Sequence, residues 1–184
     1  MAAEFAQPSK PSAQTMPINV EILINEPLWK KENRLISAKI KSLIKKIAPQ
    51  TELKKYLNKN LEIEISVVLA NDAEIKKLNK NYRHKNKPTN VLSFPAVDFR
   101  NLDKSVLDLG FMTLGDIVLS YQTIKNEADC QKKKFDDHLY HLIIHSLLHL
   151  LGHDHEKEKE AEIMENLEIN LLKKLDIANP YHIK

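Results

Sequence analysis

The sequence has very little cysteine, and its apolar residues never form a long run. Cys130 is the only cysteine among 184 residues, which excludes an intramolecular disulfide and a thiolate zinc site. Its polar surroundings favour a place on a helix face over a role as a nucleophile. No apolar stretch approaches the ~20 residues of a membrane-spanning helix, and no charged-then-apolar leader opens the chain. We therefore expect a cytoplasmic protein with no membrane partner.

A strong charge of either sign is also missing. The 28 Lys and Arg residues against 25 Asp and Glu residues give a net charge of +3, which allows a nucleic-acid partner without requiring one. The length and the 42% of hydrophobic residues suit one sizeable core rather than two domains. Residues 1–15, rich in Ala, Pro, Ser and Gln, are predicted to be a disordered leader or an over-extended start. We expect residues 16–184 to form a single domain.

The spacing of apolar residues predicts the secondary structure. Strands are predicted where apolar residues alternate or form short runs, at 18–24, 61–69, 91–94 and 114–119. Helices are predicted where the apolar spacing is helical, at 28–47, 72–82, 135–151 and 156–175. A surface loop is expected at 98–109. This order of elements predicts an α+β domain with a mixed four-stranded sheet packed with helices.

Three histidines near the end of the predicted helix 135–151 have the spacing of metal ligands. His145 and His149 are four residues apart, so their rings project from one side of a helix. Gly152 can adopt the positive φ at which many helices end, and His155 can then turn back toward the same point. Three imidazoles without a fourth protein ligand leave a coordination position open, as in catalytic zinc sites. We predict one zinc ion per chain, bound by His145, His149 and His155.

Other residues of this segment offer alternatives and support. Two histidines at this spacing could also be hydrogen-bonded core residues, but a third histidine after a glycine favours the metal site. His153 competes with His155 for the third position, and His155 is preferred because the residue directly after the glycine is still turning. His138 and His141, on the same helix, are expected to be solvated or to support the ligands. Asp154 could orient an imidazole.

The spacing His149-x-x-Gly152-x-x-His155 is also that of metzincin peptidases, so we expect a metzincin-like site. Their full signature places Glu directly after the first histidine, where it is the general base of peptide hydrolysis. Ser146 stands at that position and cannot accept a proton near neutral pH. A peptidase would need a base from elsewhere, and Ser146 is left with a supporting role beside the ligands.

A basic segment precedes the strand predicted at 91–94. It carries five cationic residues between Asn79 and Pro95, counting one histidine. Arg83 has a planar guanidinium that suits phosphate oxygens, and Lys85 and Lys87 would add a diffuse positive field. Each lysine taken alone also fits an ordinary solvated loop. The segment as a whole indicates phosphate binding.

Three blocks of sequence together resemble the YbeY family of bacterial endoribonucleases. The blocks are Tyr82-Arg83 through Lys87-Pro88-Thr89-Asn90-Val91-Leu92-Ser93-Phe94-Pro95, Leu114-Gly115-Asp116-Ile117-Val118, and the histidine segment 145–155. Their order and spacing match, and the resemblance runs from residue 18 to the end of the chain. The family motif is close to His-Gly-x-x-His-Leu-x-Gly-Tyr-Asp-His, from which this chain departs at Ser146 and His153. Asn86 and Asn90 replace a common Asp.

The resemblance implies a single-strand-specific, metal-dependent endoribonuclease that matures the 3′ end of 16S ribosomal RNA and serves ribosome quality control. It implies ribosomal RNA, the ribosome and ribosomal proteins as partners, zinc on the three motif histidines, and a functional Arg83. We predict His145 and Arg83 as catalytic residues: zinc would polarise a phosphate oxygen or activate a water, while Arg83 would stabilise the charge on phosphorus. Asp116 is expected to fix a Gly115-Asp116 turn or to support the site.

Two other functions are kept as alternatives. One is a zinc metallopeptidase with an unconventional base. The other is a ribosome-associated binding protein in which the zinc is only structural.

Overall fold

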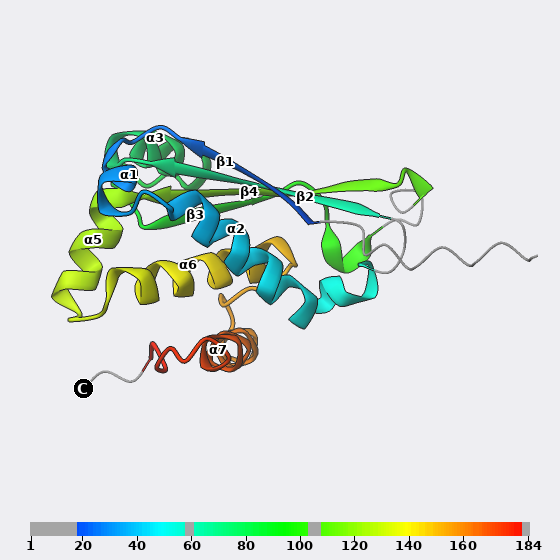
Figure 1. Ribbon diagram of the computed structural model, residues 1–184. Coiled ribbons are helices and arrows are strands. Elements are labelled where there is room, and N and C mark those ends of the chain that lie inside the picture. Colours follow the sequence, from blue (N-terminus) through cyan, green and yellow to red (C-terminus); the bar gives the residue numbers. More distant parts are fainter. Residues whose placement is uncertain (1–17, 58–60, 103–107, 182–184) are drawn as a thin grey trace, which may run out of the picture.

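The computed structural model describes residues 18–57, 61–102 and 108–181, and its strands form one mixed sheet (Figure 1). The strands are β1 (Ile18–Ile24), β2 (Glu62–Ala70), β3 (Val91–Pro95) and β4 (Phe111–Ser120). Their order across the sheet is β1-β2-β4-β3, with β1, β2 and β4 parallel and β3 antiparallel to β4. The predicted α+β class and the mixed four-stranded sheet are confirmed.

Helices cover both faces of this sheet. The described residues form six α-helices, namely α1 (Leu28–Glu32), α2 (Ile36–Ile47), α3 (Asp72–Arg83), α5 (Tyr121–Cys130), α6 (Phe135–Leu150) and α7 (Glu158–Lys173). Figure 1 shows α3 above the sheet, α2 and α6 below it, and α7 beyond α6. The chain therefore places α6 between the sheet and α7.

The main core lies on the α6 face of the sheet. Ile63, Ile65 and Val67 alternate along β2 and are almost completely buried together with Ile143 and Leu147 of α6. Each such side chain contributes roughly 1.5–3 kcal/mol through removal of apolar surface from water. A smaller cluster on the opposite face joins α3 to the sheet through Ile75, Leu92 and Val118. The side chains that are buried on β2 and α6 are thus the apolar ones from which the sequence predicts a strand and a helix.

The first helical segment differs from the prediction. One helix was expected over 28–47, but α1 ends at Glu32 and α2 begins at Ile36. Asn33 is extended (φ −151°, ψ 115°), and its Oδ1 accepts a hydrogen bond from the backbone N–H of Leu35. Asparagine competes with the helix by bonding nearby backbone groups in this way.

The helix α5 was missed by the sequence analysis. Within it the buried apolar residues are Ile124 and Ala128, so the helical pattern is weak over these ten residues. Cys130 is the last residue of α5 and is exposed, in agreement with the predicted helix-face position. The segment begins directly after β4, in a stretch to which the sequence analysis assigned neither a helix nor a strand.

The expected turn at Gly115-Asp116 is wrong, because both residues lie within β4. The register of β4 against β2 shifts at this point, which is a β-bulge. Gly115 has φ +144°, and a Cβ there would lie 2.3 Å from the carbonyl oxygen of Phe94. Asp116 is exposed on the strand, opposite Phe94. The glycine is required by this close approach of two strands.

Some expectations concern residues outside the described part of the chain. The leader expected at 1–15 lies there, as do residues 103–107 of the loop expected at 98–109. The described part of that loop includes a short 3-10 turn, Phe99–Asn101. Within the described residues no helix combines the length and apolar character needed to cross a membrane.

Candidate metal centre

The helix α6 presents four histidines on one side and ends in a well-defined turn. His138, His141, His145 and His149 follow one another at spacings of three, four and four residues. After α6, the N–H of Gly152 donates to His149 O and the N–H of His153 donates to Leu148 O, which is a Schellman motif. Gly152 has φ +83°, a conformation that costs glycine little. The turn redirects the chain so that residue 155 returns toward α6.

The structure brings His145, His149 and His155 together. One ring nitrogen from each lies within 4.8 Å of the others, and the Nε2 atoms of His145 and His149 are 3.1 Å apart. A zinc ion bound tetrahedrally at about 2.1 Å from each nitrogen would set these nitrogens roughly 3.4 Å apart. The three histidines could therefore hold a metal ion with little adjustment.

The remaining nitrogens of two of these rings are fixed by hydrogen bonds. His145 Nδ1–H donates to Glu168 Oε1 over 2.8 Å, and His149 Nδ1–H donates to the carbonyl oxygen of His153 over 2.9 Å. A proton on Nδ1 leaves the lone pair on Nε2, the atom that faces the cluster. Both rings are thus held in the tautomer that a metal ion needs.

Burial and charge favour the metal-binding form of the cluster. Burial, together with the neighbouring His145 and His155, lowers the pKa of His149 to about 4. A neutral imidazole is the form that binds a metal ion. Burial would raise the pKa of Glu168, but hydrogen bonds from His141, His145 and Tyr181 outweigh it and lower this pKa to about 2. The site therefore places a neutral ligand beside an ionised carboxylate.

The other candidates of this segment have different partners. His153 places its Nε2 3.1 Å from Glu52 Oε1, so only its backbone oxygen takes part in the cluster. Asp154 accepts a hydrogen bond from the backbone N–H of His155 and so fixes the turn rather than an imidazole. Ser146 is fully buried, and its Oγ has no hydrogen-bond partner among the described residues.

The structure contradicts one of the two expectations for His138 and His141, namely that both are solvated. His138 is 5% exposed, with its Nε2 2.8 Å from Glu127 Oε2. His141 is largely buried and its Nε2 lies 2.7 Å from Glu168 Oε2. The second expectation, that these residues support the ligands, fits His141 because it shares a carboxylate with His145.

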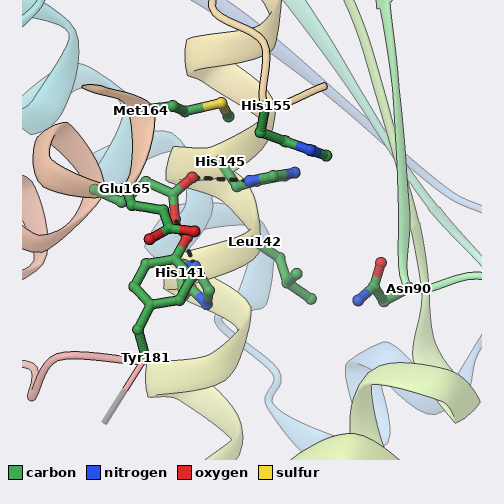
Figure 2. A pocket seen from close by; sticks show the side chains of 9 residues that line it. Asn90, His141, Leu142, His145, His155, Met164, Glu165 and Tyr181 are labelled. Carbon is green, nitrogen blue, oxygen red and sulfur yellow. Dashed lines mark hydrogen bonds and ion pairs between the residues drawn. The ribbon is translucent and has the colours of Figure 1, made fainter. Parts of the chain in front are cut away.

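A cavity of about 300 Å³ opens beside the histidines (Figure 2). His145 and His155 form one wall, Asn90 at the start of β3 lies opposite, and Glu165 and Tyr181 close the remaining side. In Figure 2 the rings of His145 and His155 point toward Asn90 across this space. A metal ion on the histidines would therefore border a space of ligand size.

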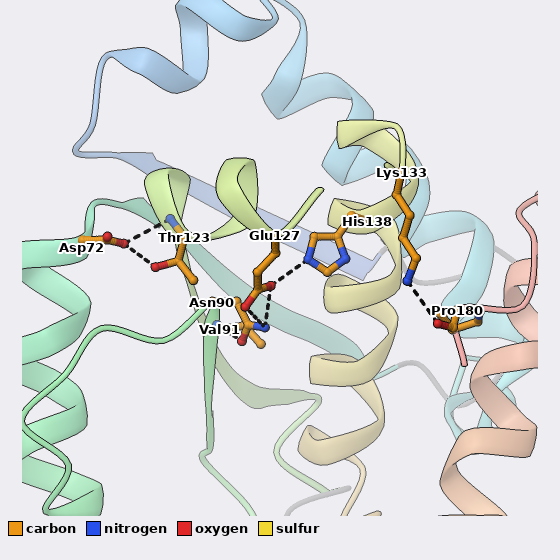
Figure 3. Close-up of polar contacts among 8 residues, drawn as sticks. All are labelled: Asp72, Asn90, Val91, Thr123, Glu127, Lys133, His138 and Pro180. Atoms are coloured by element: carbon orange, nitrogen blue, oxygen red, sulfur yellow. Dashed lines mark hydrogen bonds and ion pairs between the residues drawn. The ribbon is translucent and has the colours of Figure 1, made fainter. Parts of the chain in front are cut away.

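Asn90 is held in place by a chain of hydrogen bonds that the sequence analysis missed (Figure 3). Its Nδ2 donates to the carboxylate of Glu127, at 3.0 Å from Oε2, and its Oδ1 accepts from the N–H of Val91. The same Glu127 oxygen contacts His138. Burial would raise the pKa of Glu127, but the hydrogen bonds with His138 and Asn90 lower it. One wall of the cavity is thus fixed through α5 and α6.

Arg83, Lys85 and Lys87 belong neither to the histidine cluster nor to the lining of the cavity. Arg83 is the last residue of α3, on the sheet face opposite α6, and all three side chains are exposed. None of them lines the cavity. The segment that carries them leads from the end of α3 directly to Asn90 at the cavity wall. Exposed Asp116 also lies outside the cavity lining.

Glu168 is the main residue of the site that the sequence analysis missed. It is 1% exposed on α7 and contacts both His141 and His145. A signal was present, because position 168 is four residues after Met164 and four before Leu172, within the apolar face predicted for this helix. A carboxylate at a core position of a helix is rarely buried without partners.

The sequence and the fold both match those of known proteins. The chain is 48% identical over 120 residues to a curated Endoribonuclease YbeY from Francisella philomiragia subsp. philomiragia, covering 65% of this chain and 74% of that protein. The solution structure of TM1509 from Thermotoga maritima matches with a TM-score of 0.50 and 21% identity, covering 89% of this chain and 99% of that one. That likeness concerns the fold alone.

A family model described as Endoribonuclease YbeY matches residues 28–176. This range contains the basic segment, the three clustered histidines and the carboxylate of Glu168. The expected resemblance is confirmed, and the protein is an endoribonuclease that acts on RNA. By these matches, the chain belongs to the YbeY family of endoribonucleases.

Proposed function

We propose that this protein is a zinc-dependent, single-strand-specific endoribonuclease acting on ribosomal RNA. The observation that carries the metal dependence is the convergence of His145, His149 and His155 with two Nδ1 atoms already engaged. These three residues would hold the ion. When bound, the ion supplies a Lewis acid at the scissile phosphate. The cavity beside the histidines leaves room for the RNA at that point.

We assign a phosphate-binding role to the basic segment. Arg83, Lys85 and Lys87 are exposed cations on the stretch that runs to Asn90 at the cavity wall. An exposed guanidinium can bind phosphate oxygens in pairs, and lysines attract the RNA backbone from a distance. The segment would guide a single strand toward the histidines, with Arg83 stabilising the charge that develops on the phosphate.

The biological role that we propose is maturation of the 3′ end of 16S ribosomal RNA and ribosome quality control, in the cytoplasm and in contact with ribosomal proteins. The family assignment to endoribonucleases supports this reading. A peptidase function is not proposed, since Ser146 is fully buried at the position where a peptidase has its glutamate.

The experiment that tests the proposal pairs metal analysis with cleavage assays. We expect purified protein to contain about one zinc ion per chain and to cut single-stranded ribosomal RNA but not a duplex of the same sequence. His145→Ala should lose both the metal and the activity. Zinc-free protein that cuts RNA at the wild-type rate would overturn the metal dependence, and equal cutting of duplex RNA would overturn the strand specificity.

Arg83→Ala tests the phosphate-binding role. We expect a loss of roughly a hundredfold in the cleavage rate, the size found when one stabilising donor is removed, with zinc content unchanged. Arg34→Ala is the matched control, because Arg34 is an exposed arginine in the turn between α1 and α2. Wild-type cleavage by Arg83→Ala would contradict the assignment.

A further inference from the structure

Glu168 is a charged group in an otherwise apolar environment. It is 1% exposed on the inner face of α7, in line with buried Met164, Leu171 and Leu172. A carboxylate removed from water in this way costs several kcal/mol unless strong hydrogen bonds replace the lost hydration. Its presence in the core therefore requires specific partners.

Three donors surround this carboxylate. Oε1 accepts from His145 Nδ1 at 2.8 Å, while Oε2 lies 2.7 Å from His141 Nε2 and also accepts from the hydroxyl of Tyr181. Figure 2 shows three of these residues, His141, His145 and Tyr181, together on the side of α6 that faces α7. Both oxygens are used, so the carboxylate cannot rotate without breaking a contact.

Tyr181 belongs to the C-terminal segment after α7, which returns to α6. Its ring meets the ring of His141 edge to face, with centroids 5.7 Å apart. The preceding carbonyl of Pro180 accepts a hydrogen bond from Lys133 Nζ at 3.0 Å, and the N–H of Tyr181 donates to Asn179 Oδ1. The position of the hydroxyl is thus set by contacts along this segment.

We propose that Glu168 and Tyr181 are positioning residues for the metal centre. Glu168 fixes the ring of His145 with its Nε2 toward the cluster, and Tyr181 fixes the carboxylate of Glu168. Metal retention therefore depends on a residue outside the histidine motif and on the C-terminal segment. The inference rests on the proposed function, in which His145 holds the metal ion. Groups that orient a ligand in this way typically change metal affinity 10–100-fold.

The test measures Zn²⁺ affinity by competition with a chromophoric chelator, without any RNA. Glu168→Gln should weaken binding by about tenfold or more. Tyr181→Phe removes only the hydroxyl and should weaken binding in the same direction, by about threefold or more, a smaller effect because it acts through Glu168. The visible spectrum of bound Co²⁺ should change in both variants, because the orientation of the His145 ring changes.

Tyr121→Phe is the matched control. Its hydroxyl also donates to a glutamate, Glu32, at 2.8 Å, on residues that lie outside the cavity lining. We expect wild-type Zn²⁺ affinity from this variant. Thermal unfolding of the metal-free proteins shows whether Glu168→Gln still folds. If it does not fold, the Zn²⁺ affinity of Tyr181→Phe alone tests the positioning role.

The outcomes separate the two proposals. Wild-type protein that binds no metal overturns the proposed function and this inference with it. Wild-type protein that binds Zn²⁺, with folded Glu168→Gln and Tyr181→Phe showing wild-type affinity and Co²⁺ spectra, overturns the positioning role alone.

Discussion

At the scale of single residues, two glycines stand where the backbone passes close to another part of the chain. Gly115 allows β4 to pass close to β3, and Gly152 allows the turn that brings His155 back to α6. Both have positive φ, but their surroundings differ. The nearest atom to an added Cβ is a backbone oxygen at Gly115 and a side-chain carbon of Arg100 at Gly152.

This difference predicts the order of two substitutions. Gly115→Ala should lower the midpoint of thermal unfolding more than Gly152→Ala, because the Phe94 carbonyl 2.3 Å away cannot move without its strand. At Gly152 the flexible Arg100 side chain can retreat, so the cost is that of the backbone conformation, about 1–2 kcal/mol. Calorimetry of both metal-free variants measures the order, and a larger loss from Gly152→Ala would contradict it.

Between elements, polar contacts rather than apolar ones fix the site. The carboxylate of Glu127 connects α5 to Asn90, the residue directly before β3, and to His138 of α6 (Figure 3). The carboxylate of Glu168 joins α7 to α6. Glu168 is held by two histidines, and Glu127 is held by one histidine and one amide. Each side of the cavity therefore depends on one carboxylate.

At this scale Glu127→Ala should destabilise the protein without reducing its Zn²⁺ affinity. The change leaves His138 buried without its partner, which costs about 1–3 kcal/mol, while the three clustered histidines keep their contacts. Asp129→Ala is the control on the same helix, since its ion pair with Lys125 is long and exposed and is worth less than about 1 kcal/mol. Urea unfolding and zinc titration give the two quantities; equal stability of both variants would refute the prediction.

For the whole molecule, the metal centre lies beside a core that is already complete. The main cluster joins β2, β4, α2 and α6 through buried apolar side chains, and none of the three clustered histidines belongs to it. A domain with its own core does not need a metal ion to fold, in contrast to small zinc domains without one.

Removal of the metal should therefore abolish cleavage and leave the fold. We expect chelated protein to keep its far-ultraviolet circular dichroism and a cooperative thermal transition, and added Zn²⁺ to raise the midpoint as a bound ligand does. A chelated protein that unfolds would instead favour a structural zinc ion.

Local patterns in the sequence determined the strands, the principal helices and the grouping of the three histidines. The alternation along β2, the spacing of His145 and His149 on α6, and the glycine before His155 are each set within a few residues, where periodicity is informative. Only the tertiary structure decided the break after α1, the helix α5, and the contacts of Glu168, Tyr181 and Glu127. The residues in these contacts come from different elements and are brought together by packing, which no local pattern encodes. The position of α3, which ends at Arg83, on the sheet face opposite α6 was also decided by packing. The sequence of the basic segment does not indicate on which face of the sheet its helix packs.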